Sequence, residues 1–194
     1  MDVKEILKTA ILFLNREELL EDAFFLQEVG EDYVENPARE KEIERLLQCL
    51  NLVYQEVTSE YLPLIFEEEI SPNKDKVFFT NLSKSVLEVQ KVMSANGNRI
   101  GFRLFPDHIL LNANYEKVKI RYTYEPDVLT KTSVISNYGG KLPKRVLAYG
   151  VAMEFSFISS LSDEAYIWEA RYKDSLKNIV RKKHEVKLPV RRWI

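Results

Sequence analysis

The sequence predicts an α+β protein: an α-helical bundle with an inserted antiparallel β-meander and an extended C-terminal tail. Two changes of pattern carry this prediction. Apolar residues recur at helical spacing up to Pro63, short runs of β-forming residues follow from Lys76, and helical spacing returns after Leu142. We therefore expect the helical bundle in residues 1–75 and 127–185, the β-subdomain in residues 76–126 and the tail in residues 186–194.

The first part of the chain is predicted to form three helices. An amphipathic N-terminal helix is indicated by apolar residues at helical spacing, namely Val3, Ile6, Leu7, Ala10, Ile11 and Leu14. Asn15 and Glu18 have the spacing of a capping box, which predicts a short second helix ending near Gly30. A long third helix is expected to begin after Asn36, its cap, and to end at Pro63, which cannot continue it.

The middle of the chain is predicted to form an antiparallel sheet. Its strand-like runs are 77–79, 86–92, 99–105, 109–111 and 117–124. Asn96-Gly97 predicts a tight hairpin between the second and third runs. Before the sheet, the acidic run Glu67 to Glu69 is placed in a connecting segment, where it serves either solvation or binding.

The stretch from Val146 to Ile158 is apolar on nearly every side, with Glu154 as its one charge. A helix without a polar face must be surrounded by protein or lipid, and this one is too short to span a membrane. We therefore expect a central helix around which the others pack, with Gly150 allowing close approach of a neighbour. Ser162 is placed to cap a second, amphipathic helix, whose inner stripe is Ala165, either Ile167 or Trp168, Tyr172, Leu176 and Ile179.

Two segments lack regular periodicity. Residues 127–142 follow no clear pattern, and so long a segment inside a compact domain is usually functional or ordered only on binding. The tail cannot continue a helix past Pro189, and it places apolar residues among basic ones. We predict a docking peptide; a tail folded back over its own core is the alternative. The candidate partner-binding residues are Leu188, Pro189, Val190, Arg191, Arg192, Trp193 and Ile194.

Charge is distributed unevenly along the chain. Residues 1–70 carry 6 Lys and Arg against 18 Asp and Glu, a net charge of −12, whereas residues 171–194 carry 9 against 2, a net charge of +7. This asymmetry has two interpretations. The charges either solvate helix faces, or the basic end of one copy meets the acidic region of another.

No motif for catalysis or metal binding is present: the sequence has no Gly-rich phosphate loop, paired-cysteine spacing, zinc helix or nucleophile elbow. Cys49, the only cysteine, lies among helix apolars and is predicted to be a core thiol. His108 in a turn and His184 at a basic helix end are typical of structural histidines. Glu154 is expected to have a cationic partner, Arg145, Arg171 or Lys173. We therefore expect no enzyme activity, no cofactor and no metal.

Nucleic-acid binding is the alternative function. Tyr115, Tyr122 and Tyr124 interleave with three cations, as in a strand that stacks bases and neutralises phosphates; the cations are Lys117, Lys119 and Arg121. The alternation nevertheless places Tyr122 and Tyr124 on the same face as Val118 and Ile120, opposite the cations. That arrangement indicates core aromatics beneath a solvated face.

Four stretches carry a resemblance to a known family: YEPD at 124–127, LPKRVLAYGVAMEF at 142–155, DEAYIWEARYKDSL at 163–176 and LPVRRW at 188–193. Together with the order of the elements, they resemble the head-to-tail adaptor proteins of tailed bacteriophages and prophages. The similarity is to the tail tubular A, or gatekeeper, group of short-tailed phages in particular. In organisation it covers most of the chain.

The resemblance implies a structural protein of the virion neck or tail, which assembles in the cytoplasm of the bacterial host. Members of the family form a ring, usually of twelve copies, that joins the portal protein above to a tail or nozzle protein below. The C-terminal segment, here Leu188 to Ile194, is implied to reach the portal or a neighbouring subunit. Incidental contact with DNA in the channel is expected, and no contact with a membrane. Ring closure needs two different complementary surfaces on each copy, which oppositely charged ends would supply.

Overall fold

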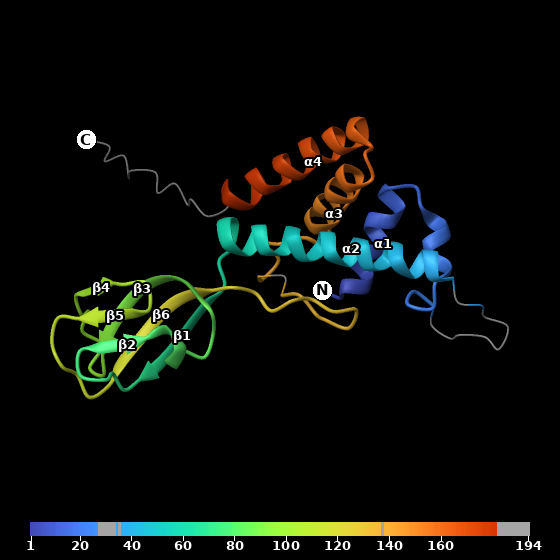
Figure 1. Cartoon of the computed structure of the whole chain (residues 1–194). Coiled ribbons are helices and arrows are strands. Elements are labelled where there is room, and N and C mark those ends of the chain that lie inside the picture. The colour runs from blue at the N-terminus through green and yellow to red at the C-terminus, as the bar shows by residue number, and fades with distance from the viewer. Residues whose placement is uncertain (27–33, 35, 137, 182–194) are drawn as a thin grey trace, which may run out of the picture. The chain divides into compact units, whose positions relative to one another are not determined.

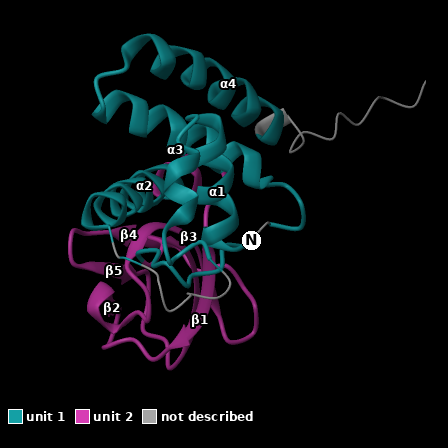
Figure 2. Ribbon diagram, turned by 90° about the vertical axis from the view of Figure 1, so that its right-hand side faces the viewer, with its two compact units in different colours: residues 1–54, 128–194 teal, residues 55–127 magenta. Residues whose placement is uncertain are grey.

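The computed structural model describes residues 1–26, 34, 36–136 and 138–181 (Figure 1). Within these residues the protein has four α-helices and two three-stranded antiparallel sheets, so the predicted α+β class is confirmed. The chain divides into two compact units, which we call the helical unit, Met1–Tyr54 with Val128–Ile194, and the sheet unit, Gln55–Asp127 (Figure 2). The sheet unit is inserted into the helical one, and it begins earlier in the chain than the expected residue 76.

The helical unit is built around α3, as its sequence predicts. Its helices are α1 Val3–Phe13, α2 Pro37–Glu56, α3 Lys144–Ile158 and α4 Ser162–Arg181. Helix α3 packs against α1 and α4 and buries residues on nearly every side, from Val146 to Ser156. The expected stripe of α1 is buried from Val3 to Leu14. Where the second helix was expected, the described residues up to Leu26 form a short 3-10 helix, η1, over Glu17–Glu21.

Gly150 is the point at which α3 meets its neighbours most closely. A methyl group placed there would lie 2.5 Å from Cγ1 of Val53 on α2 and 3.1 Å from Cε2 of Tyr172 on α4. Since no Cβ is accommodated at 2.5 Å, only glycine fits without repacking. The close approach predicted for this residue is therefore confirmed.

A Ser156→Ala variant should be more stable than the wild-type chain. Ser156 on α3 is fully buried, and its hydroxyl has no hydrogen-bond partner within the described residues. Because a buried polar group without a partner loses its bonds to water, its removal should raise the free energy of unfolding by about 1 kcal/mol. Denaturant titration measures this, with the exposed Ser159→Ala as the matched control. A loss of stability at Ser156 would show that the hydroxyl is bonded after all.

Residues 128–136, which we call the strap, are ordered without forming a helix or strand. Leu129 and Ile135 are buried in the helical unit. The Leu129 amide donates to Oδ1 of Asn51 at 2.7 Å, and Nδ2 of Asn51 donates back to the Leu129 carbonyl at 3.1 Å. The Ile135 amide donates to the Met1 carbonyl at 2.7 Å. This part of the segment expected over 127–142 therefore forms hydrogen bonds and apolar contacts within its own unit.

The sheet unit contains six strands: β1 Ile65–Ile70, β2 Lys76–Phe78, β3 Val86–Ser94, β4 Phe102–Leu104, β5 His108–Leu111 and β6 Val118–Tyr124. They pair in the orders β1-β6-β3 and β2-β5-β4, so both sheets are antiparallel but neither follows the chain order of a simple meander. Their shared core consists of Val77, Leu82, Val89, Val92, Ile100, Ile109, Leu111, Val118, Ile120 and Tyr122.

Two predictions for this region are settled by the pairing. The hairpin turn at Asn96-Gly97 is confirmed, since Gly97 has φ +80° and its amide donates to the Ser94 carbonyl at 2.9 Å. After Ile100, however, the chain leaves this hairpin, and β4 joins the second sheet. The placement of Glu67 to Glu69 in a connecting segment is wrong, because these residues form the middle of β1.

Candidate functional site

The seven residues predicted to bind a partner, Leu188 to Ile194, lie outside the described residues. The tail therefore stays a prediction from the sequence. The described residues allow the other candidates to be placed: the basic strand, the acidic first part of the chain, the isolated histidine and glutamate, and the surfaces of the helical hairpin.

The cations of β6, and Lys117 immediately before it, form ion pairs with the acidic run of β1. Antiparallel pairing places Glu67 opposite Arg121 and Glu69 opposite Lys119. Glu67 forms ion pairs with Lys119, at 2.6 Å, and with Arg121, at 2.7 Å. Lys117 lies 2.9 Å from Glu69. The hydrogen bonds from Lys119 and Arg121 lower the pKa of the Glu67 carboxyl. These exposed ion pairs occupy the charges that would otherwise meet phosphates.

Tyr122 is a core residue of the sheet unit. It is fully buried, and its hydroxyl donates to a carboxylate oxygen of Glu68 while accepting from the Lys84 amide at 3.3 Å. Burial and the neighbouring Glu68 carboxylate raise the pKa of Tyr122. A ring inside the core cannot stack on a base, and its strand's cations are already paired. Tyr122 is therefore not available to stack on a base.

The sheet unit should lose stability in acid through Glu68. Burial works to raise the pKa of this carboxyl, but hydrogen bonds from Ser83 and Tyr122 outweigh it and hold the pKa below its ordinary 4.5. A carboxylate whose pKa is lowered by folding stabilises the folded state above its ordinary pKa, and this contribution disappears as the pH falls through the folded-state pKa. Thermal unfolding from about pH 7 to about pH 3 should therefore show the wild type and Glu68→Gln converging in acid. A difference that stays constant with pH would contradict this assignment.

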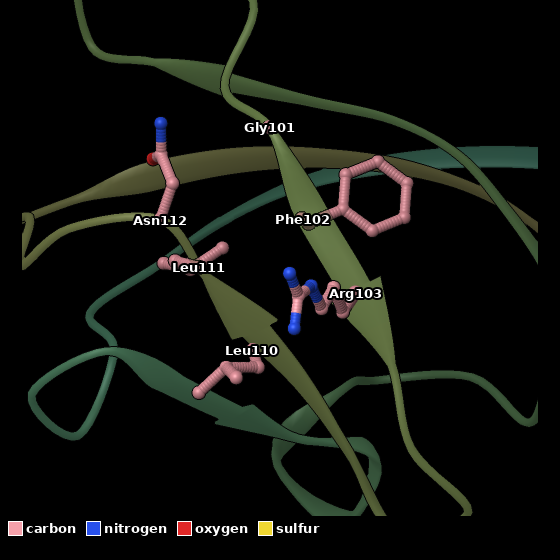
Figure 3. A pocket seen from close by; sticks show the side chains of 6 residues that line it. All are labelled: Gly101, Phe102, Arg103, Leu110, Leu111 and Asn112. Atoms are coloured by element: carbon pink, nitrogen blue, oxygen red, sulfur yellow. The ribbon is translucent and has the colours of Figure 1, made fainter.

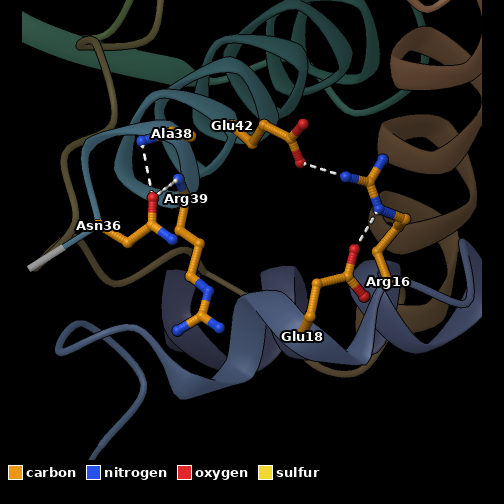
Figure 4. A network of polar contacts seen from close by, with 6 residues as sticks. All are labelled: Arg16, Glu18, Asn36, Ala38, Arg39 and Glu42. Carbon is orange, nitrogen blue, oxygen red and sulfur yellow. Dashed lines mark hydrogen bonds and ion pairs between the residues drawn. The ribbon is translucent and has the colours of Figure 1, made fainter.

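Several carboxylates of the acidic first part of the chain form ion pairs within the helical unit. Arg16 bridges η1 and α2 by pairing with Glu18 and, at 2.6 Å, with Glu42 (Figure 4). Arg39 lies 2.6 Å from Glu21. In the same region Asn36 caps α2, as predicted, by accepting from the Ala38 and Arg39 amides (Figure 4). Because Arg16 and Arg39 belong to the same first part of the chain, these pairs engage three of its carboxylates but leave its net charge of −12 unchanged.

The sheet unit has an open pocket of about 380 Å³ (Figure 3). It is lined by Gly101, Phe102, Arg103, Leu110, Leu111 and Asn112. None of these six residues carries a carboxylate, thiol or imidazole, so the lining supplies no group for proton transfer near neutral pH. His108 on β5 is buried instead, with Nδ1 2.7 Å from Asp107 and its ring stacked on Phe105 at 4.8 Å. Both a hydrogen bond and a ring contact therefore engage the imidazole within the sheet unit.

Cys49 and Glu154 belong to the interior of the helical unit. Cys49 is fully buried on α2, as predicted. Burial, together with the charge of Glu154, raises the pKa of its thiol to about 12, so the thiol stays protonated at neutral pH. Glu154 is half-buried on α3. Because a protonated thiol is a poor nucleophile, Cys49 is not activated for nucleophilic attack.

The turn between α3 and α4 carries a group of exposed apolar side chains that the sequence did not reveal. We call it the turn cluster: Phe157, Ile158, Leu161, Tyr166 and Ile167, which are 40–62% exposed. Phe157 and Tyr166 meet edge to face, with ring centroids 5.9 Å apart. Ile167 was one of two candidates for the inner stripe of α4. Trp168 takes that place, because it stacks on Phe13 and Tyr149.

The other end of the α3–α4 hairpin has a pocket of about 320 Å³, which we call the basic pocket. It is lined by Lys141, Pro143, Arg145, Val146, Ser175, Asn178 and Ile179. Pro143 is the N-cap of α3. The first turn of α3 contains no acidic residue. The positive end of the helix dipole therefore adds to the charge of Lys141 and Arg145.

In the part of the chain that the structure describes, no cluster of three or more His, Cys, Asp or Glu side chains is arranged to hold a metal ion. No helix in that part combines the length and apolar character that a membrane crossing requires. No known protein family matches the chain, and no curated protein does so either.

Proposed function

We propose that the protein is a head-to-tail adaptor of a tailed bacteriophage or prophage, a ring subunit that joins the portal to the tail. The observation that carries this proposal is the turn cluster. Five large apolar side chains gathered at one exposed turn are typical of a protein-interaction surface, whereas single exposed apolar residues are ordinary. A structural role also agrees with the groups described above: the imidazole of His108, the thiol of Cys49 and the half-buried carboxylate of Glu68 are engaged in packing or hydrogen bonding.

The tail adds a second contact to this proposal. Residues 186–194 combine Arg191 and Arg192, which favour an acidic surface, with Trp193 and Ile194, which can fill an apolar pocket. We propose that this peptide docks on the portal or on a neighbouring copy. It would then contribute to association and little to the stability of the monomer.

Truncation before Leu188 tests this function. A buried Trp and its charged neighbours each contribute roughly one to a few kcal/mol at an interface, so truncation should weaken binding to the portal ring at least about tenfold. The melting temperature should stay close to that of the full chain. Portal binding is measured by sedimentation or surface immobilisation, with the full chain and a Lys187→Ala variant as controls.

Two results would contradict the proposal. If the full chain does not bind a portal ring of the same phage at micromolar concentration, the adaptor function is wrong. If truncation leaves portal binding unchanged and lowers the melting temperature by many degrees, the tail covers its own core and is no docking peptide.

A further inference from the structure

We propose that the turn cluster of one copy docks into the basic pocket of a second copy. This inference deepens the proposed function and rests on it in one respect, because it names the contact through which copies would assemble into a ring. Both surfaces belong to the helical unit, and all the residues that form them are described. The occupant that we assign to the basic pocket is a second copy of this chain, for the reasons of charge and shape given next.

The turn cluster has the composition of a plug. Phe157 and Ile158 are the last residues of α3, and Leu161 follows in the turn, in which Ser160 has φ +60°. Beside them, Asp163 and Glu164 begin α4 and are exposed. Neither carboxylate has an ion-pair partner among the residues that the structure describes. The surface thus has an apolar centre beside negatively charged residues, which resembles the apolar core and polar rim of a typical protein interface.

The basic pocket has the complementary composition. Pro143, Val146 and Ile179 supply an apolar lining, and Lys141 and Arg145 supply positive charge. Within the described residues neither cation forms an ion pair; Arg145 lies over the ring of Tyr149, 6.0 Å from its centroid. The adjacent Lys144, in contrast, is 3.6 Å from Glu5. The two cations that line the pocket are therefore the ones left to meet the carboxylates of another copy.

The two surfaces cannot meet within one chain. The turn cluster follows the C-terminal end of α3, and the basic pocket surrounds its N-terminal end. Figure 1 shows α4 running back along α3, so that the turn and the pocket lie at opposite ends of the hairpin. A helix of 15 residues is about 22 Å long, which separates the two surfaces by that distance. Their contact is therefore between copies and head to tail, the kind of interface that generates a closed ring or a filament.

Charge reversal tests this contact on the protein alone, without a portal. One variant carries Asp163→Lys and Glu164→Lys, and the other carries Lys141→Glu and Arg145→Glu. Each variant by itself brings like charges together, so its self-association should be at least about tenfold weaker than that of the wild type. In a mixture of the two variants, every turn again meets a pocket of opposite charge, and association should return. Sedimentation equilibrium measures both, and circular dichroism verifies that each variant is folded.

Cysteine cross-linking tests the head-to-tail geometry. Leu161→Cys places a thiol in the turn, and Asn178→Cys places one in the pocket, while the native Cys49 is buried. Oxidation of a mixture should give cross-linked pairs containing one copy of each variant, and far fewer pairs from either variant alone. Equal cross-linking of each variant with itself would overturn the head-to-tail contact.

The remaining outcomes also decide the proposal. A wild-type chain that stays monomeric at the highest attainable concentration, or a mixture of charge variants that does not recover association, would overturn it. Because neither experiment uses the portal, these failures are separate from a failure of the adaptor function. A chain that binds the portal but fails both experiments keeps the adaptor function and loses this contact.

Discussion

A Gly150→Val variant should unfold with a free energy about 3 kcal/mol lower than that of the wild-type chain. Even the first added carbon would lie 2.5 Å from Val53 and 3.1 Å from Tyr172, and both side chains are almost fully buried. Val53 is β-branched and therefore stiff, so it cannot move aside cheaply. Helices α2 and α4 must repack around α3, which is the source of the loss.

Denaturant titration followed by tryptophan fluorescence measures this loss. Trp168 stacks on Phe13 at 5.3 Å within the helical unit, so its emission reports on the packing around α3. Gly101→Val is the matched control, because only the side-chain nitrogen of Asn112, at 3.8 Å, lies near that glycine. Equal stability of the two variants would contradict the close approach at Gly150.

Adding Val53→Ala to a Gly150→Ala variant should restore part of the lost stability. The substitution removes the two methyl groups that the new Cβ meets, Cγ1 and Cγ2, which lie 2.5 and 2.9 Å from it. Residues in direct contact show interaction energies of roughly 0.5–3 kcal/mol in a double-mutant cycle. If the double variant instead loses the sum of the two single-variant losses, the strain at position 150 does not come from Val53.

The helical unit was predictable because its signals are local. The apolar run of α3, the stripe of α1 and the Asn36 cap each lie within a few turns of chain, and each is found where it was expected. The choice between Ile167 and Trp168 was not local. The two are neighbours in sequence, and only the stacking of Trp168 on Phe13 and Tyr149 decides which one faces inward.

The sheet unit was less predictable because its pairing is between distant segments. β1 was not predicted because it contains three consecutive glutamates. Such a strand is stabilised by the cations of the strand paired with it. The opposite residues, Lys119 and Arg121, are fifty or more positions away in the chain. The strand orders β1-β6-β3 and β2-β5-β4 likewise depend on partners that no window of sequence contains.

The candidate surfaces divide in the same way. The tail was proposed as a docking peptide from its composition. Because it lies outside the described residues, that prediction rests on the sequence alone. The turn cluster was missed because Phe157 and Ile158 end an apolar run whose earlier residues are buried. Composition does not show where the neighbouring helices stop covering a run. Ser159 and Ser160, which break the helical pattern immediately afterwards, were the available signal.

An Asn51→Ala variant should lose about 2–3 kcal/mol of unfolding free energy. The side-chain amide of Asn51 bonds both the N–H and the C=O of Leu129 and so holds the strap in place. Asn51 accepts from the Leu129 amide and donates to the Leu129 carbonyl, and the side chain of Leu129 is buried. Truncation removes both bonds and leaves two backbone groups without partners. Denaturant titration measures the loss; Asn114→Ala, at an exposed loop position, should stay within about 0.5 kcal/mol of the wild type.

Proteolysis of the same variant distinguishes local release of the strap from general destabilisation. Lys131 lies within the strap, where it is 3.7 Å from Glu40, and it is a potential site for trypsin. If Asn51 holds the strap, its loss lowers the free energy of local opening, so cleavage after Lys131 should accelerate more than cleavage elsewhere in the helical unit. Asn51→Asp keeps the acceptor for the Leu129 amide and should fall between the wild type and the alanine variant. Uniform acceleration at all sites would show that Asn51 stabilises the whole unit and not the strap in particular.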